Sequence, residues 1–190
     1  MYKFLSYRPV VPDDAKMLLD WRTAPHVTQY MLTDVPYDIE RQAAWIERCN
    51  ARDDYQHCII QIEGRDVGYS SITLTDKRSQ IGEIGVYIGD QSAPHALTAY
   101  NFAGTLNHAF FSMGLHKLVN HVVDWNSRTI RTQTFIGYRH VGVLEGHVLK
   151  DGARHDLHIF EQSAAHWAEF RKKFAHTTNW WGEETVYRGR

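Results

Sequence analysis

Hydrophobic positions near the N-terminus alternate at first and then recur at helical spacing. Residues 2–10 alternate as in a strand, and the proline and carboxylates of 12–14 are typical of a helix start. Apolar residues three and four positions apart then predict a helix over 15–21. A proline interrupts this pattern, and after it we expect a second short helix over 27–31 and a third over 38–46.

The rest of the chain begins with strands and then alternates helices with strands. We expect strands over 57–62, 66–75 and 82–88, a helix over 93–113, a strand over 118–123, a helix over 127–136, strands over 138–149 and 154–160, and a helix over 164–174. Gly114 and Gly137 supply the left-handed conformation that ends a helix. This mixed order predicts an α/β fold: a single mixed central sheet of about seven strands flanked by helices, in a domain over 1–174 with a tail over 175–190.

Composition and charge are those of a globular protein of one domain, and they exclude several classes. The 190 residues carry 21 basic and 22 acidic side chains, a net charge of −1, which offers no basic surface to nucleic acid or an anionic membrane. No stretch approaches the roughly 18 apolar residues of a membrane helix. Cys49 and Cys58 are too few for a disulfide framework, so we expect free thiols and a cytoplasmic protein.

Twelve histidines raise the question of a metal site. His155 and His158 are three apart on an expected strand and so point to opposite faces, while a turn separates His116 from His121. None of these spacings is that of a zinc site, and we expect no metal.

Segments spread along the chain carry a resemblance to a known family. They are 8–22 followed by Val27 and Met31, the strand Gly82-Glu83-Ile84-Gly85-Val86-Tyr87-Ile88, the run from Ala109 to Leu144, and the closing run 147–156. In order and spacing they resemble the Gcn5-related N-acetyltransferases (GNAT), specifically the branch of ribosomal-protein alanine and nucleotide-amino-sugar acetyltransferases, over residues 3–161. The resemblance implies a central sheet whose strands splay apart, acetyl-CoA as co-substrate and an amine as acceptor.

The resemblance also implies where the cofactor lies. The backbone of Val86, Tyr87 and Ile88 would hold the pantetheine arm and give one N–H to the carbonyl oxygen, which are backbone roles that any side chain permits. Asn126 opens a later helix, where it is either a cofactor contact or an N-cap.

The loop that precedes the long helix departs from the family's pattern. That pattern is Arg/Gln-x-x-Gly-x-Gly/Ala, whereas this chain has Ala93–Thr98 with no glycine and with Pro94, which lacks an N–H. The helix N-terminus remains as an anion site, with His95 and Thr98 as side-chain donors and Ala96 leaving room for a pyrophosphate.

Two residues are candidates for catalytic roles. If Glu83 faces the cleft, it takes the proton from the attacking ammonium; otherwise it is a carboxylate bonded to backbone groups where the sheet splays. Gln133 stands where many family members carry a tyrosine that protonates the leaving thiolate. Either the Gln133 amide donates a hydrogen bond to that thiolate, or Gln133 is merely an exposed helix residue. The cysteines lie away from the resembling site, which disfavours a covalent thiol route.

The acceptor is expected beside the first helices. Trp21, Arg22, Tyr30 and Met31 lie there, and an arginine among aromatic residues suits a nucleotide or phosphate. Ser70, Ser71 and Thr73 on the expected strand over 66–75 are further candidates for the acceptor pocket. Ordinary helix packing and polar strand positions are the alternative readings of these residues.

We therefore expect an N-acetyltransferase that acts by direct attack on a small amine acceptor, for which a nucleotide-linked amino sugar is the first choice. A protein N-terminus is another acceptor. Alternatives that keep the fold use an acyl carrier protein or aminoacyl-tRNA as donor, or bind a ligand without catalysis. The tail packs on the domain or, in a homodimer, against a second subunit.

Overall fold

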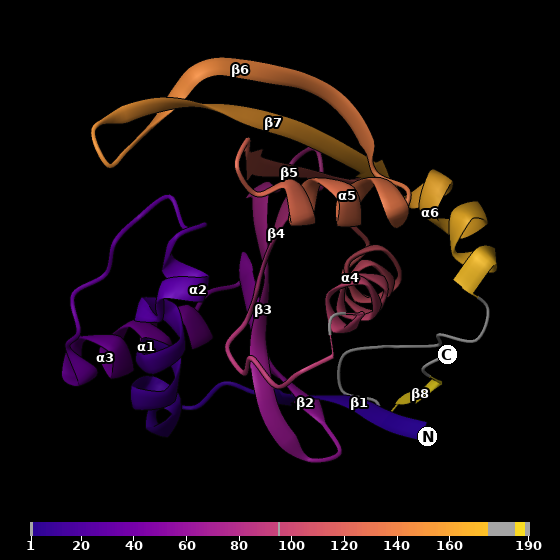
Figure 1. Cartoon of the computed structure of the whole chain (residues 1–190). Helices are drawn as coiled ribbons and strands as arrows, with labels where there is room; N and C mark the ends of the chain where they lie inside the picture. The colour runs from indigo at the N-terminus through magenta and orange to yellow at the C-terminus, as the bar shows by residue number, and fades with distance from the viewer. Residues whose placement is uncertain (1, 95, 175–184, 189–190) are drawn as a thin grey trace.

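The computed structural model describes residues 2–94, 96–174 and 185–188. The strands are β1 (Tyr2–Pro9), β2 (Tyr55–Ile62), β3 (Arg65–Asp76), β4 (Ile81–Ile88), β5 (Lys117–Val123), β6 (Arg139–Lys150), β7 (Ala153–Ser163) and β8 (Thr185–Arg188). The helices are η1 (Pro12–Asp14), α1 (Ala15–Thr23), α2 (Pro25–Thr28), α3 (Ile39–Asn50), α4 (Leu97–Asn107), η2 (His108–Ser112), α5 (Ser127–Phe135), α6 (Ala164–Phe170) and η3 (Arg171–Phe174). Within the described chain the strands form one sheet in the order β6-β7-β5-β4-β3-β2-β1-β8 (Figure 1).

The sheet is mixed, as the sequence predicts. Neighbouring strands run antiparallel except β4 and β5, which are parallel because α4 and η2 cross over between them. The expected strands are β1–β7, and residues 185–188 of the tail add β8 alongside β1. The fold class is confirmed, whereas the domain boundary at 174 stays a prediction.

Two helix starts differ from expectation. Pro25 begins α2 instead of ending the preceding helix, because proline is favoured at a first helical position. The long helix begins at Leu97, four residues later than expected, because the chain first makes turns in which Ala93 N–H donates to the Asp90 carbonyl and Leu97 N–H to that of Pro94. The α-helix α4 ends at Asn107, and the π-helical segment η2 follows it directly.

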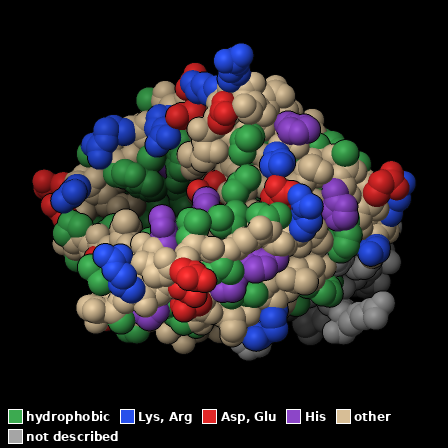
Figure 2. Space-filling view, turned by 90° about the horizontal axis from the view of Figure 1, so that it is seen from above, with side chains coloured by type: hydrophobic (Ala, Val, Ile, Leu, Met, Phe, Trp, Pro, Cys, Tyr) green, Lys and Arg blue, Asp and Glu red, His purple; other side chains and the backbone are tan. Residues whose placement is uncertain are grey.

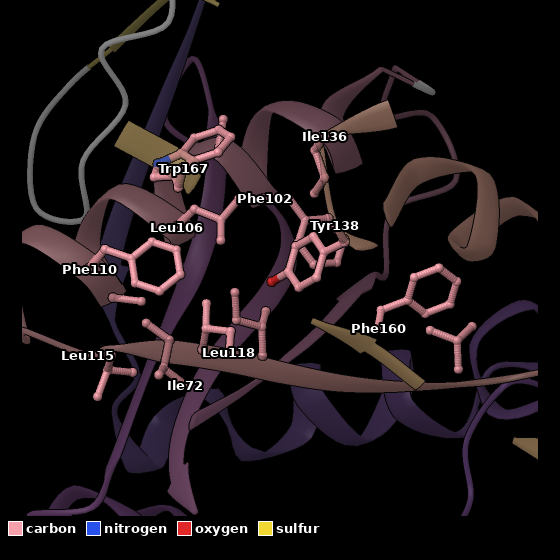
Figure 3. Packing of buried hydrophobic residues seen from close by; sticks show 14 residues of the cluster. Ile72, Phe102, Leu106, Phe110, Leu115, Leu118, Ile136, Tyr138, Phe160 and Trp167 are labelled. Carbon is pink, nitrogen blue, oxygen red and sulfur yellow. The ribbon is translucent and has the colours of Figure 1, made fainter. Parts of the chain in front are cut away.

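Helices cover both faces of the sheet. Figure 1 shows α1, α2 and α3 on one face and α4, α5 and α6 on the other, with the β6–β7 hairpin arching over the top. The largest apolar cluster lies between α4, α5, α6 and the sheet (Figure 3). Its Phe102, Leu106, Leu118, Phe160 and Trp167 are at most 1% exposed, and burying each side chain contributes about 1.5–3 kcal/mol. This core fixes α4 and α5 against the edges of β4 and β5.

The first residues of the N-terminal segment of the family resemblance, from Arg8 to Asp14, have a structural role. Arg8 makes paired hydrogen bonds to Asp14 at 2.7 and 2.8 Å and reaches Asp66 from the same guanidinium. These bonds hold β1, η1 and β3 together, and the hydrogen bond from Arg8 lowers the pKa of Asp66. None of the described helices combines the length and apolar character needed to cross a membrane.

Candidate active site

β4 and β5 separate shortly after they meet. Among the described residues their pairing consists of Ile81 with Lys117 and Gly82 with Leu118, after which the strands diverge. Beyond that point the Asn120 side chain, 2% exposed, takes the place of a partner strand. The splayed sheet is therefore confirmed.

Asn120 also fixes which groups of β4 face the opening. Its Oδ1 accepts the Ile84 backbone N–H at 3.0 Å, so that N–H points toward β5. In a strand, N–H groups two residues apart point to the same side. The N–H groups of Val86 and Ile88 therefore point into the gap between the strands.

A cavity of about 650 Å³ passes through this gap. On one face of the sheet it is lined by α4 and α5, through residues such as Thr98, Phe102 and Gln133. On the other face it is lined by α2 and the residues after it, including Tyr30 and Met31. Figure 2 shows that the face seen from above is hollowed on the side where α1–α3 lie, with basic side chains around the hollow. Two molecules can thus approach the gap from opposite faces.

Glu83 of β4 and His121 of β5 form a pair inside this cavity. Glu83 Oε1 accepts from His121 Nδ1 at 2.9 Å and from the His121 backbone N–H at 3.3 Å, and the side chains are 37% and 34% exposed. A carboxylate only accepts hydrogen bonds, so Nδ1 carries the proton and Nε2 of a neutral ring keeps its lone pair. The pair can accept a proton from a group in the cavity.

Gln133 and Asn126 lie on the opposite wall, on and before α5. Gln133 is 2% exposed, so its interpretation as an exposed helix residue is wrong. Its Oε1 accepts from Asn120 Nδ2 at 3.4 Å, which leaves its own amide N–H groups as donors. Asn126 Oδ1 accepts the Thr129 N–H at 3.1 Å, the N-cap role, while the residue also lines the cavity.

One end of the cavity lies at the N-terminus of α4. The pyrophosphate of coenzyme A would bind at this end. Pro94 and Thr98 line it, and Arg128 and Thr129 of α5 line it from across the gap. Ala96 stands at the N-cap position without a side-chain cap bond and outside the lining, and His95 lies outside the described residues. The helix dipole, a threonine hydroxyl and a guanidinium suit a diphosphate, so the donor set fits.

A second cavity, of about 470 Å³, lies between β4, α3 and the loop before α3. It shares Met31, Tyr55 and the stretch Gly85-Val86-Tyr87 with the first cavity, so the two meet at the gap. Tyr87 stacks on Tyr69 with ring centroids 5.1 Å apart, and burial raises the pKa of both phenols.

A hydrogen-bonded chain ends at the junction of the cavities. Asn50 Nδ2 donates to the Val10 carbonyl, so Asn50 Oδ1 accepts from His57 Nε2–H at 2.7 Å. Burial lowers the pKa of His57 to about 4, so its neutral Nδ1 accepts the Tyr69 hydroxyl at 3.0 Å. Tyr69 then accepts from the Tyr55 hydroxyl at 2.6 Å, and the Tyr55 oxygen itself has Ser71 as a further hydrogen-bond partner.

The acceptor residues expected from sequence divide into two groups. Tyr30, Met31 and Arg22 line one or both cavities. Trp21 lines neither: its ring lies so close to Gly89 that no Cβ fits there. Ser70 is also a correction, because it is fully buried on the α4 face with its hydroxyl 3.2 Å from that of Thr105.

Ser71 and Thr73, the other candidates on β3, line the first cavity, because alternate residues of a strand face the same side. His121, Arg41 and Arg48 line the cavities too, although the sequence pattern does not single them out for this role. The sequence points to His121 only as a metal ligand. Arg41 and Arg48 of α3 line the second cavity, and their spacing of seven residues was the available signal. Among the described residues no group of three or more His, Cys, Asp or Glu side chains is placed to hold a metal ion.

Comparison with known proteins agrees with this geometry. The family described as Acetyltransferase (GNAT) domain matches residues 5–139. A comparison with curated proteins gives no match.

Solved structures show the same fold. The spermidine N-acetyltransferase from Vibrio cholerae, in complex with CoA and spermine, superposes with a TM-score of 0.81 at 12% identity, covering 86% of this chain and 98% of that one. A chimaera of the Vibrio cholerae enzyme SpeG with hSSAT superposes with a TM-score of 0.78 at 13% identity, with the same coverage of 86% and 98%.

Proposed function

Since the chain belongs to the GNAT acetyltransferase family, we propose that it transfers an acetyl group from acetyl-CoA to a primary amine at the gap between β4 and β5. The observation that supports this site most strongly is the cavity that crosses the sheet, with Glu83 and His121 inside it. The donor approaches along the α4–α5 face, and the amine approaches from the α2–α3 face. Acetyl-CoA supplies the activated thioester.

In this proposal His121 accepts the proton and Glu83 is a positioning residue. His121 Nε2 takes the proton from the substrate ammonium, and the carboxylate at Nδ1 holds the ring in the required tautomer and stabilises its cationic form. This refines the expectation that Glu83 is itself the base. The amine attacks directly, so the mechanism uses no cysteine.

The negative charge that develops on the thioester is stabilised by other donors in the cavity. The Val86 N–H, which faces the gap, stabilises negative charge on the thioester oxygen. The Gln133 amide donates a hydrogen bond to the departing sulfur. A thiol such as that of cysteine has a pKa of about 8.5, so the sulfur departs as a thiolate with a hydrogen bond and without a proton from Gln133. The thiolate takes the second nitrogen proton, which the attack makes acidic, so the products are the amide and free coenzyme A.

The identity of the acceptor stays a prediction. A fold shared at 12% sequence identity does not identify the substrate. The spermine bound by the Vibrio cholerae enzyme is therefore no evidence for the acceptor of this chain. The acceptors expected from sequence are a nucleotide-linked amino sugar and a protein N-terminus, and the alternatives are a non-CoA donor and ligand binding without catalysis. The experiment below separates CoA-dependent transfer from these two alternatives.

The proposal places this activity in a reducing cytoplasm. Cys49 and Cys58 are buried free thiols in the described chain, and burial raises the pKa of both, which keeps them protonated and unreactive. Association into a homodimer also stays a prediction, which sedimentation analysis checks.

Acetyl-CoA binding and turnover test the proposal separately. At 100 times its Kd, acetyl-CoA adds about 2.7 kcal/mol of stability, which raises the melting temperature by about 5–10 °C. Free thiol released with a panel of amines then measures transfer. No thermal shift at millimolar acetyl-CoA contradicts the CoA-dependent function, and a shift without thiol release leaves binding without catalysis.

A further inference from the structure

One face of α3 presents positive charge to the second cavity. Arg41, Trp45 and Arg48 follow each other at spacings of four and three residues, so they share one helix face, and all line the cavity. At a rise of about 1.5 Å per residue the two arginines start about 10 Å apart along the helix. Arg22 lines the same cavity from α1.

The acids beside this cavity are already engaged. Among its described lining residues the carboxylates are Asp34 and Asp38. Asp34 pairs with Lys150 at the tip of the β6–β7 hairpin, at 2.9 Å. Asp38 caps α3 by accepting the Arg41 backbone N–H at 2.9 Å. Asp38 keeps its negative charge, because the N–H that it accepts is neutral. The three arginines that line the cavity nevertheless outnumber its two carboxylates, one of which pairs with Lys150, so the net charge that faces the cavity is positive.

Arg22 has a donor that the protein leaves unused. Its Nη2 donates to the carbonyl and hydroxyl of Thr33, while its Nη1 is buried and has no hydrogen-bond partner among the described residues. Burial lowers the pKa of this guanidinium, which nevertheless stays charged at neutral pH. A buried unpaired N–H of a cation is costly, and an anion in the cavity would satisfy it.

The arrangement of the two cavities indicates where each part of an acceptor would bind. They meet at Tyr55 and the stretch 85–87, so an amine at the gap continues toward the arginines. The hydroxyl oxygens of Tyr55 and Ser71, which line the first cavity, can each accept a hydrogen bond from an ammonium there. Trp45, Tyr69 and Tyr87 provide aromatic walls between the two ends.

Resting on the proposed function, we infer that the acceptor is an amine that also carries a carboxylate or phosphate, which Arg22, Arg41 and Arg48 bind. Guanidinium groups pair with either anion in bidentate geometry, and three of them repel a polycation. This cavity therefore disfavours a polyamine such as the spermine bound by the Vibrio cholerae enzyme.

Matched amines test this inference. Initial rates with acetyl-CoA are measured for 2-aminoethyl phosphate against ethanolamine, and for β-alanine against its amide, with spermidine as the polycation. We expect kcat/KM for the preferred anionic amine to exceed that of its neutral partner by about 10–100-fold, the range of one or two hydrogen bonds to a charged group. The two pairs distinguish phosphate from carboxylate. Equal or better rates with the neutral amines or spermidine overturn the inference.

Substitutions then assign the effect to the cavity. Arg41→Gln and Arg48→Gln should each lower the ratio of kcat/KM for the anionic amine to kcat/KM for its neutral partner by about 10-fold or more. Arg78→Gln, an exposed residue in the β3–β4 turn, is the matched control and should change neither. Equal loss for both amines in the cavity variants contradicts an anion site.

A binding measurement separates this inference from the proposed function. The thermal shift produced by N-acetyl-β-alanine is compared with that of its amide, and the N-acetyl derivative of 2-aminoethyl phosphate with that of ethanolamine. If no amine is acetylated, the proposed function fails. The anion site is still supported in that case if an anionic compound gives a larger thermal shift than its neutral partner and Arg48→Gln abolishes this difference. If amines are acetylated but neither anionic compound is preferred, the inference fails alone.

Discussion

Substitution of Glu83 or His121 distinguishes the two ways in which this pair can remove a proton. Glu83→Gln keeps an oxygen that accepts the His121 Nδ1 proton and removes the negative charge. His121→Gln keeps a polar side chain of similar size and removes the ring nitrogen. If His121 is the base, the second substitution is the more damaging one.

The expected magnitudes follow from the geometry. Glu83 Oε1 lies 2.9 Å from His121 Nδ1, and both side chains are about one-third exposed, so solvent screens the pair. Loss of the charge should cost about 1–2 kcal/mol, or about 5–30-fold in kcat. Loss of a general base costs about 10²–10⁴-fold.

The assay is thiol release from acetyl-CoA at a saturating amine concentration, across the range of pH in which the wild-type rate changes. His116→Gln is the control, because His116 is exposed and outside the cavity, and its rate should equal that of the wild type. A loss of 10²-fold or more in Glu83→Gln with little change in His121→Gln would refute the assignment and make Glu83 the base.

Three further substitutions test the surroundings of the site. Gly89→Ala places a methyl group on the Trp21 ring and should cost about 1–3 kcal/mol in a denaturant titration; an unchanged midpoint would show that Trp21 does not pack there. Asn120→Ala leaves the buried Ile84 N–H without its acceptor, so the melting temperature should fall by about 2–10 °C, and no fall would contradict the bridge across the gap. The pKa of His57 is about 4 in the folded state and 6.5 when unperturbed, so only the unfolded state gains a proton as the pH falls below 6.5. Stability should drop by about 1–2 kcal/mol between pH 6.5 and 4 after allowance for solvent screening, and urea titrations of His57→Gln should lack this drop.

The order and type of the elements could be predicted because the periodicity of the chain is strong. The start of α4 could not, because Pro94 is equally suited to the first turn of a helix and to the turn that precedes one, and the chain uses the turn. The sequence also did not show which face of β3 lines the cavity. Its central residues are buried on both faces, so no polar alternation shows that Ser71, and not Ser70, faces the acceptor side.

The site itself depends on contacts between distant parts of the chain. Glu83 stood out as a carboxylate in an apolar strand, but its partner His121 is 38 residues away, and pairing required the parallel crossover between β4 and β5. The arginines of α3 share a visible helical face, yet helical spacing does not distinguish a solvent face from the wall of a cavity. Such assignments need the packing of α3 against β4.

Hydrogen–deuterium exchange with and without acetyl-CoA tests the location of the reaction most directly. Saturating acetyl-CoA should slow exchange at the N–H groups of Val86 and Ile88, which face the gap, and in the first turn of α4, while the remote strand β1 exchanges as before. Protection confined to other segments, or no change at 84–88 under conditions where acetyl-CoA binds, would contradict a transfer site between β4 and β5.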